Sequence, residues 1–137
     1  MKYWVIGFTP STYEVVKKQK TIGVRANVWG RFSTEMQIGD KFVSYVSSRV
    51  IFDSIGTITS NARFEEDMLF DQVKFYPSRR KIEFEKINLS VPATKLFNGI
   101  APFNEKNTHA GNYLMIKGGF VEVCKADYDW LVKELTD

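Results

Sequence analysis

The chain has 137 residues, a length that suits one domain, and 44% of them are hydrophobic, which argues against a disordered protein. The formal net charge of +3 permits binding to nucleic acid without requiring it. The single cysteine, Cys124, excludes an intrachain disulfide. Together with the lack of a signal peptide or an apolar run of about 20 residues, it predicts a reducing, cytoplasmic location and no membrane partner.

The first quarter of the chain predicts a strand and a short helix. Residues 2–8 are apolar and aromatic, as in a buried strand. Ser11 and Glu14 match a capping box, in which each side chain satisfies a free backbone N–H at the start of a helix. Gly23 is expected to end this region, and a loop should follow.

The rest of the chain predicts a group of strands and a final helix. Segments 41–48 and 54–60 alternate apolar and polar residues, which indicates neighbouring antiparallel strands. Segment 79–91 shows the clearest alternation. Pro92 is expected to begin a short helix. Residues 125–137 carry an apolar stripe at helical spacing and predict an amphipathic helix.

Short strands with helices between them and at the end favour an α+β domain or a small barrel flanked by helices. The predicted helices are too few and too irregularly spaced for a doubly wound parallel sheet. We therefore expect one α+β domain over residues 1–137.

Catalytic and metal-binding patterns are scarce. His109 is the one histidine, and with Cys124 it gives too few ligands for a zinc site. As a nucleophilic pair the two are conceivable, but nothing marks the thiol as activated. The acidic run Glu65, Glu66 and Asp67 could serve acid–base chemistry, although a solvated face is the more ordinary interpretation. Glycine-rich phosphate motifs are missing. The sequence predicts neither an enzyme nor a cofactor.

Aromatic residues interleaved with arginine are the remaining signal. An aromatic ring can stack on an unpaired base while a guanidinium binds phosphate. Taken singly, each ring is more often part of a core, and Trp130 on the last helix is expected to be structural. The aromatic residues at predicted strand ends and loops are Trp4, Trp29, Tyr45, Phe64, Phe75 and Tyr76, and the arginines near them in sequence are Arg25, Arg31, Arg49, Arg79 and Arg80.

Several short motifs occur in a recognisable order. They are Tyr3-Trp4, Ile22-Gly23-Val24-Arg25, Ile38-Gly39-Asp40 with Tyr45, Tyr76-Pro77-Ser78-Arg79 and the closing segment DYDWLVKEL. In this order they resemble the EVE domain, a member of the PUA-like superfamily related to YTH domains. Ile22 departs from the family's usual aromatic residue, and the segment 98–119 matches poorly.

The resemblance implies a PUA-like pseudo-barrel of mixed strands flanked by short helices, with a concave pocket for a flipped and frequently modified nucleobase. Members of the family occur alone and as DNA-reading modules of modification-dependent restriction systems, and some relatives read RNA. By resemblance, the base would contact an aromatic cage of Trp29 and Tyr45, with Trp4, Phe64 and Tyr76 as further rings. The backbone of Gly23 and Val24, the hydroxyls of Ser47 and Ser48 and the phosphate-binding arginines Arg25, Arg31, Arg79 and Arg80 would complete the site.

Three functions remain open. The first is a binding module, not an enzyme, whose partner is DNA or RNA carrying a modified base. The second is a small hydrolase or transferase that uses Glu65, Glu66 or Asp67 with His109. The third is a protein-interaction module within a larger multidomain or multisubunit assembly.

Overall fold

The computed structural model describes residues 1–65, 76–104, 113–114 and 117–137. Strands are β1 (Tyr3–Phe8), β2 (Thr21–Val24), β3 (Lys41–Val46), β4 (Ile51–Ile58), β5 (Arg63–Phe64), β6 (Ser78–Lys86), β7 (Val91–Pro92) and β8 (Phe120–Val123). Helices are α1 (Pro10–Gln19), α2 (Trp29–Thr34), α3 (Ala101–Asn104) and α5 (Lys125–Thr136), with short 3₁₀ turns η1 (Ala26–Val28) and η2 (Leu96–Gly99). Within these described ranges, no helix is long and apolar enough to cross a membrane.

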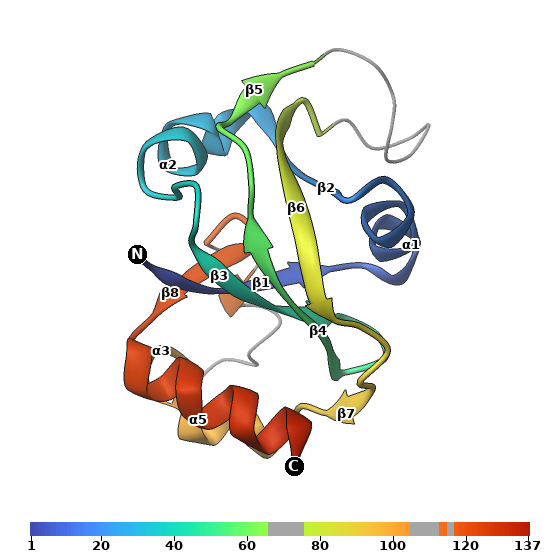
Figure 1. Ribbon diagram of the computed structural model, residues 1–137, viewed down its shortest axis with the longest axis vertical. Coiled ribbons are helices and arrows are strands. Elements are labelled where there is room, and N and C mark those ends of the chain that lie inside the picture. The colour runs from blue at the N-terminus through green and yellow to red at the C-terminus, as the bar shows by residue number, and fades with distance from the viewer. Residues whose placement is uncertain (66–75, 105–112, 115–116) are drawn as a thin grey trace.

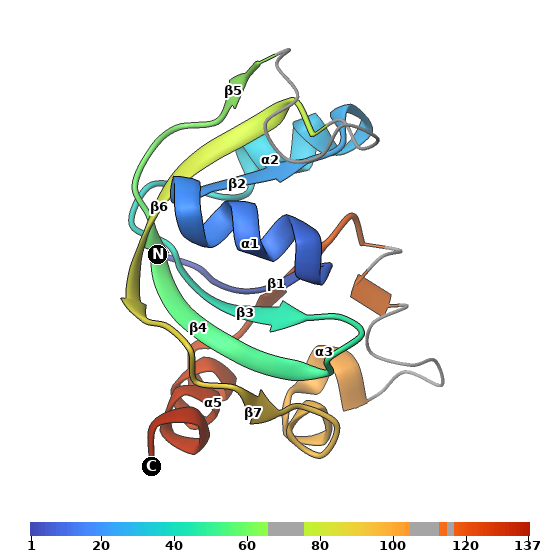
Figure 2. The same cartoon turned by 90° about the vertical axis from the view of Figure 1, so that its right-hand side faces the viewer.

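The strands form one curled sheet in the order β2-β6-β4-β3-β1-β8 (Figures 1 and 2). β1 runs parallel to β3, and the other neighbours along this path are antiparallel. Register shifts between Ser44 and Tyr45 and between Ile55 and Gly56 mark irregularities in β3–β4 and β4–β6, and such irregularities increase the local twist and bend of strands. The result is an α+β half-barrel with short helices around it, which confirms the predicted fold class.

Three local predictions are corrected by this pairing. Gly23 does not end the first helical region but lies inside β2, where it pairs with Arg79 of β6. The N-cap of α1 is Thr9, whose hydroxyl accepts from the Thr12 amide at 3.4 Å, with Pro10 as the first helical residue; Ser11 is exposed. Pro92 belongs to β7 and begins no helix.

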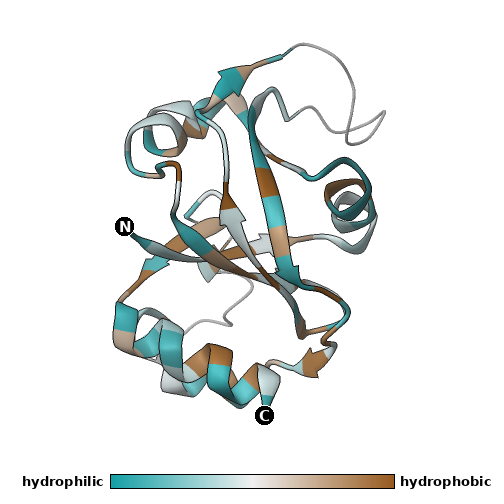
Figure 3. Cartoon of the chain, in the orientation of Figure 1, coloured by the Kyte–Doolittle hydropathy of each residue, from teal (hydrophilic) through white to brown (hydrophobic). Residues whose placement is uncertain are grey.

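Two hydrophobic clusters cover the two faces of the sheet. The first includes Trp4, Phe8 and Phe32 and lies beneath α1 and α2. The second includes Val5 and Phe97 and lies beneath α5, η2 and α3. Successive residues of β1 therefore point to opposite clusters, as the two-residue period of a strand requires. In Figure 3, α5 carries brown and teal patches along its length, as the predicted amphipathic stripe requires.

Candidate functional site

A pocket of about 540 Å³ lies between β1 and β2, which are not paired with each other in the curled sheet. One wall is β2, an edge strand of the described sheet that pairs only with β6. The opposite wall is the end of β1 with the segment 118–120, joined by the hydrogen bond from the Gly7 amide to the Gly119 carbonyl at 2.8 Å. An edge strand has backbone N–H and C=O groups without ladder partners, so β2 can offer such groups to a ligand.

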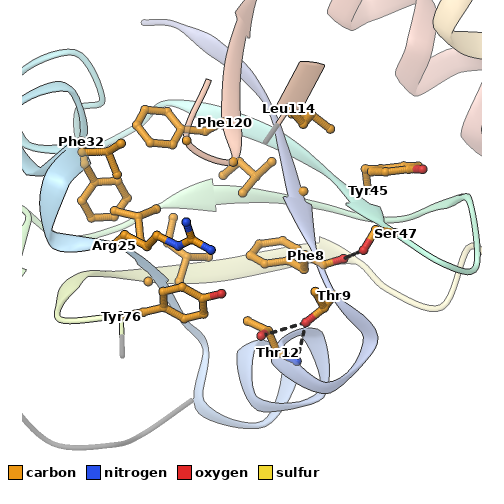
Figure 4. A pocket seen from close by; sticks show the side chains of 18 of the residues that line it. Phe8, Thr9, Thr12, Arg25, Phe32, Tyr45, Ser47, Tyr76, Leu114 and Phe120 are labelled. Atoms are coloured by element: carbon orange, nitrogen blue, oxygen red, sulfur yellow. Dashed lines mark hydrogen bonds between the residues drawn. The ribbon is translucent and has the colours of Figure 1, made fainter. Parts of the chain in front are cut away.

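Aromatic rings form much of the pocket wall (Figure 4). Phe8 projects into the space from β1, Tyr76 lies below Arg25, and Phe32 and Phe120 lie at the left and the top of the view. Phe32 and Phe120 contact each other edge to face at 5.8 Å, and Phe8 stacks on Tyr13 at 5.6 Å. Flat apolar faces of this kind suit a planar ligand.

The hydroxyl groups of Ser47, Thr9 and Thr12 add polarity to the pocket lining. Ser47 donates to the Phe8 carbonyl at 3.2 Å, and Thr9 donates to the Thr12 hydroxyl at 3.0 Å. A hydroxyl has one donor hydrogen and two acceptor lone pairs. Within the described part of the chain, Thr12 therefore keeps its hydrogen and Ser47 keeps acceptor capacity for a ligand.

The charge around the pocket has one sign. Arg25 is exposed at the lining, and its guanidinium makes no hydrogen bond or ion pair with any described residue; no carboxylate lines the pocket within those residues. In Figure 4 Arg25 lies beside Tyr76. An unpaired guanidinium next to an apolar space without acidic groups favours a ligand with a flat neutral part and an attached anion.

The hairpin between β3 and β4 is strained at the pocket. Ser48 has φ of 68° and Val50 has φ of 53°, and both line the pocket. A β-branched residue in this region is an outlier that costs roughly 1–3 kcal/mol, and such strain gathers at functional sites.

Arg31 connects two walls of the pocket. Its guanidinium donates to the Lys117 carbonyl and, at 3.3 Å, to the Phe120 carbonyl. It also lies 4.5 Å from the Phe120 ring centre and pairs with Glu35 at 3.3 Å. These contacts tie α2 to residues 117–120 and give Arg31 a structural role, and its expected phosphate contact stays a prediction.

Seven residues predicted from the sequence line the pocket together: Gly23, Val24, Arg25, Tyr45, Ser47, Ser48 and Tyr76. Tyr45 is the most enclosed of these, with 2% of its surface exposed. Its ring packs edge to face on Phe52 and Phe97, and burial raises the pKa of its hydroxyl. Tyr45 is therefore part of the pocket floor and not a free wall of a cage.

Three predicted rings lie elsewhere. Trp4 has no exposed surface, and its indole N–H donates to the Asp40 carboxylate at 3.0 Å, so it is a core residue. Trp29 and Phe64 do not line the pocket; they contact each other edge to face at 6.3 Å. The aromatic cage predicted around Trp29 is corrected accordingly: its sequence neighbour Val28 faces the pocket and Trp29 does not.

Arg79 and Arg80 are also corrected, because each is only 1% exposed and cannot reach a phosphate outside. Arg80 donates to the carbonyls of Phe32, Met36 and Ser60, and so satisfies the C-terminal end of α2 and the residues after it. Burial lowers the pKa of Arg80, and nearby Asp40 opposes that shift. Arg79 donates to the Tyr76 carbonyl at 2.9 Å and pairs with Glu65 at 3.4 Å.

The predicted acidic group gives no catalytic constellation in the described residues. Glu65 is engaged by Arg63 and Arg79. Glu66, Asp67, Phe75 and His109 lie outside the described residues. Cys124 is exposed at the residue before α5. Within the described ranges, no three His, Cys, Asp or Glu side chains are grouped for a metal.

The sequence interpretation missed Phe8, Thr9, Thr12 and the Gly118-Gly119 pair. Thr9-Pro10 is a start signal for a helix, and the threonine hydroxyls face the pocket because α1 begins at the end of β1. The glycine pair was the other available signal: both residues have positive φ, at 84° and 98°.

Comparisons with known proteins support the fold. No family model matches the chain, and no curated protein matches its sequence. The YTH domain of the Zygosaccharomyces rouxii MRB1 protein, solved in complex with N6-methyladenosine RNA, superposes with a TM-score of 0.70 at 17% identity, covering 99% of this chain and 85% of that one. The YTH domain-containing protein mmi1, solved with RNA, superposes with a TM-score of 0.71 at 10% sequence identity, covering 98% of this chain and 80% of that one. A hypothetical protein from Leishmania major superposes with a TM-score of 0.66 at 16% sequence identity, covering 98% of this chain and 94% of that one. The chain thus has a YTH-like fold within the PUA-like architecture.

Proposed function

We propose that this chain is a nucleic-acid-binding module that holds one extruded nucleobase in the pocket between β1 and β2. The observation that carries the proposal is the lining: aromatic faces and hydroxyl groups around a pocket of about 540 Å³, with the unpaired guanidinium of Arg25 and no carboxylate in the described lining. The RNA-bound YTH neighbours support the same function. Membership of the EVE family rests on the sequence motifs and stays part of this proposal.

In this mechanism the base stacks against Phe8 and Tyr76, and Arg25 binds the phosphate of the extruded nucleotide. Extrusion costs a few kcal/mol and is cheapest for a base that is already unpaired. Stacking returns about 1–3 kcal/mol per base. The Thr12 hydroxyl donates to one atom of the base edge and the Ser47 hydroxyl accepts from another, with the free backbone groups of β2 as further partners.

Selection of a modified base follows from the same geometry. A methyl group that fills apolar space adds about 0.8 kcal/mol, which is a modest preference. A larger preference requires a hydrogen bond that the wrong base leaves unmade. We propose RNA as the first partner to test, with modified DNA, as in a restriction system, as the alternative.

The test is a titration of labelled nine-nucleotide RNA and DNA strands, each with one central base that is unmodified, N6-methylated adenine or 5-methylated cytosine. We expect at least one modified strand to bind more tightly than its unmodified counterpart. Arg25→Gln should weaken that binding roughly tenfold, because a charge-assisted hydrogen bond is worth about 1.5–3 kcal/mol. The matched control is Lys133→Gln, which removes the same charge from an exposed site on α5, on the other side of the sheet.

Equal affinity for every strand, with equal losses in the two variants, would reduce the interaction to nonspecific attraction of a basic protein and would contradict the proposal. A steep dependence on salt would accompany that result.

A further inference from the structure

An aromatic pair lies outside the pocket, on α2 and β5. Trp29, the first residue of α2, is half-buried, and Phe64 in β5 has 51% of its surface exposed. The two rings meet edge to face at 6.3 Å. Phe64 is one of four large hydrophobic residues exposed in the described chain, and the others, Met1, Ile38 and Ile87, are aliphatic. We call Trp29 and Phe64 the aromatic platform.

The platform adjoins the pocket through the backbone on both sides. Trp29 directly follows Val28, which lines the pocket. Phe64 pairs with Ser78 in the β5–β6 ladder, two residues from Tyr76, which also lines the pocket. Figure 1 shows α2 and β5 side by side at the same end of the molecule. The platform therefore lies beside the wall of the pocket that Val28 and Tyr76 form.

The charges around the platform favour a polyanion. Arginines outnumber acidic residues in the described segments that carry it: Arg25 and Arg31 flank Trp29, Arg63 precedes Phe64, and Glu35 and Glu65 oppose them. Arg25 stays unpaired in this set. Because the other two arginines form ion pairs with these glutamates, the surplus is the single charge of Arg25, which a phosphate can use.

We propose that the aromatic platform stacks an unpaired base that neighbours the extruded nucleotide, so that the ligand of this protein is a single strand and not an isolated nucleoside. The inference rests on the proposed function, because it places the platform beside a base-binding pocket. Stacking on aromatic faces is tolerant of base identity, since every base has a π-face. The pocket would thus select the base, and the platform would add affinity without sequence preference.

The test uses an unmodified oligoadenylate of nine nucleotides and the intrinsic fluorescence of Trp29. A Trp130→Phe background leaves Trp29 and the fully buried Trp4 as the indoles. We expect the oligoadenylate to quench Trp29 in a saturable way, and Phe64→Ala to weaken its binding about tenfold. Ile87→Ala is the matched control, because Ile87 has a similar exposed fraction of 47% and lies at the other end of β6. It should bind like the parent.

The outcomes separate the two proposals. Saturable quenching that survives Arg25→Gln, without any preference for modified strands, would keep the platform and overturn the pocket as a base reader. Binding of a modified strand without quenching, and with no loss in Phe64→Ala, would keep the pocket and overturn the platform. Absence of both quenching and binding would overturn both and would leave the exposed rings as a surface for a protein partner.

Discussion

The same strands face α5, η2 and α3 on one side and α1 and α2 on the other, and the two sides are filled differently. On the α5 side, Tyr45, Phe52, Phe97 and Phe103 form a chain of ring contacts with centroid distances from 4.8 to 5.9 Å. Figure 1 shows α5 lying across that face. The aromatic side chains pack together there and cover the sheet face, and of these four rings the pocket reaches Tyr45.

On the α1 side, part of the aromatic cluster lines a space in place of filling it: the rings of Phe8, Phe32, Tyr76 and Phe120. Hydrogen bonds fix the position of these walls: the Arg31 guanidinium donates to the Phe120 carbonyl, and the Gly7 amide donates to the Gly119 carbonyl. Aromatic content therefore does not by itself identify a binding site. The site differs because hydrogen bonds fix the segments that carry its rings. The rings are thereby kept from packing together into the space between them.

The largest expected contrast comes from removing one ring on each side. Phe97 and Phe8 are 5% and 6% exposed, and so they are matched in burial. Phe97→Ala should cost about 3–5 kcal/mol, because it leaves a closed cavity. Phe8→Ala should cost about 2 kcal/mol, because the lost ring only enlarges an open pocket. Urea denaturation measures the free energy of unfolding of both variants. Equal losses would contradict the difference between a closed cluster and an open pocket.

A second contrast lies between two arginines of the pocket side. Arg80→Met should lose about 3 kcal/mol of stability, because it leaves the carbonyls of Phe32, Met36 and Ser60 without a donor. Arg25→Met should change stability by less than about 0.5 kcal/mol, because Arg25 is exposed and its guanidinium has no partner in the described chain. Thermal unfolding of the two variants checks this; a stable Arg80→Met would show that α2 holds without it.

The arginines also show what the sequence could predict. Strand periodicity correctly located β3, β4 and β6, and the apolar stripe located α5, because these signals are local. The burial of Arg80 was not predictable, since it depends on contacts with carbonyl groups of α2 and the residues after it, which are more than 40 positions away in the sequence. A charged residue in an alternating strand is expected to face water, and here carbonyl groups of another element satisfy it.

The pocket was also predicted only in part, because the sequence shows local motifs but not contacts between distant segments. Val24, Arg25 and Tyr76 were identified because they belong to local motifs. Trp29 was placed in the cage by the family resemblance, but after the 3₁₀ turn η1 it is Val28 and not Trp29 that lines the pocket. Phe8 was missed because a phenylalanine in a buried strand carries no sign of which cluster it faces.

A smaller effect is expected from closing the pocket wall at a glycine. Gly118 has φ of +84°, and an added Cβ would meet Val28 Cγ1 at 2.7 Å. Gly118→Ala should therefore cost about 2 kcal/mol and weaken strand binding, since η1 must shift. Gly39→Ala is the control: its φ is +93° but nothing lies within 4 Å of the new Cβ, so it should cost about 1 kcal/mol and leave binding unchanged. Similar binding losses in both variants would exclude a role for the Val28 contact.

The smallest effect comes from an ion pair that joins strands on the α5 side. Lys41 donates to Glu85, which also accepts from Thr57 at 3.1 Å, and the Lys41 contact lowers the pKa of Glu85. Because the pKa of Glu85 is depressed in the folded state, the stabilisation by this ion pair is present above the ordinary carboxyl pKa. It is lost as the pH falls through the pKa of Glu85 in the folded state.

Glu85→Gln should therefore lower the free energy of unfolding by less than about 1 kcal/mol near neutral pH, since the pair is partly exposed. It should have no effect once the parent carboxyl is protonated in acid. Glu134→Gln on α5, where no described residue forms an ion pair with Glu134, should show no such pH dependence in chemical denaturation. A cost of Glu85→Gln that persists at the acid end would show that Glu85 acts through packing and not through charge.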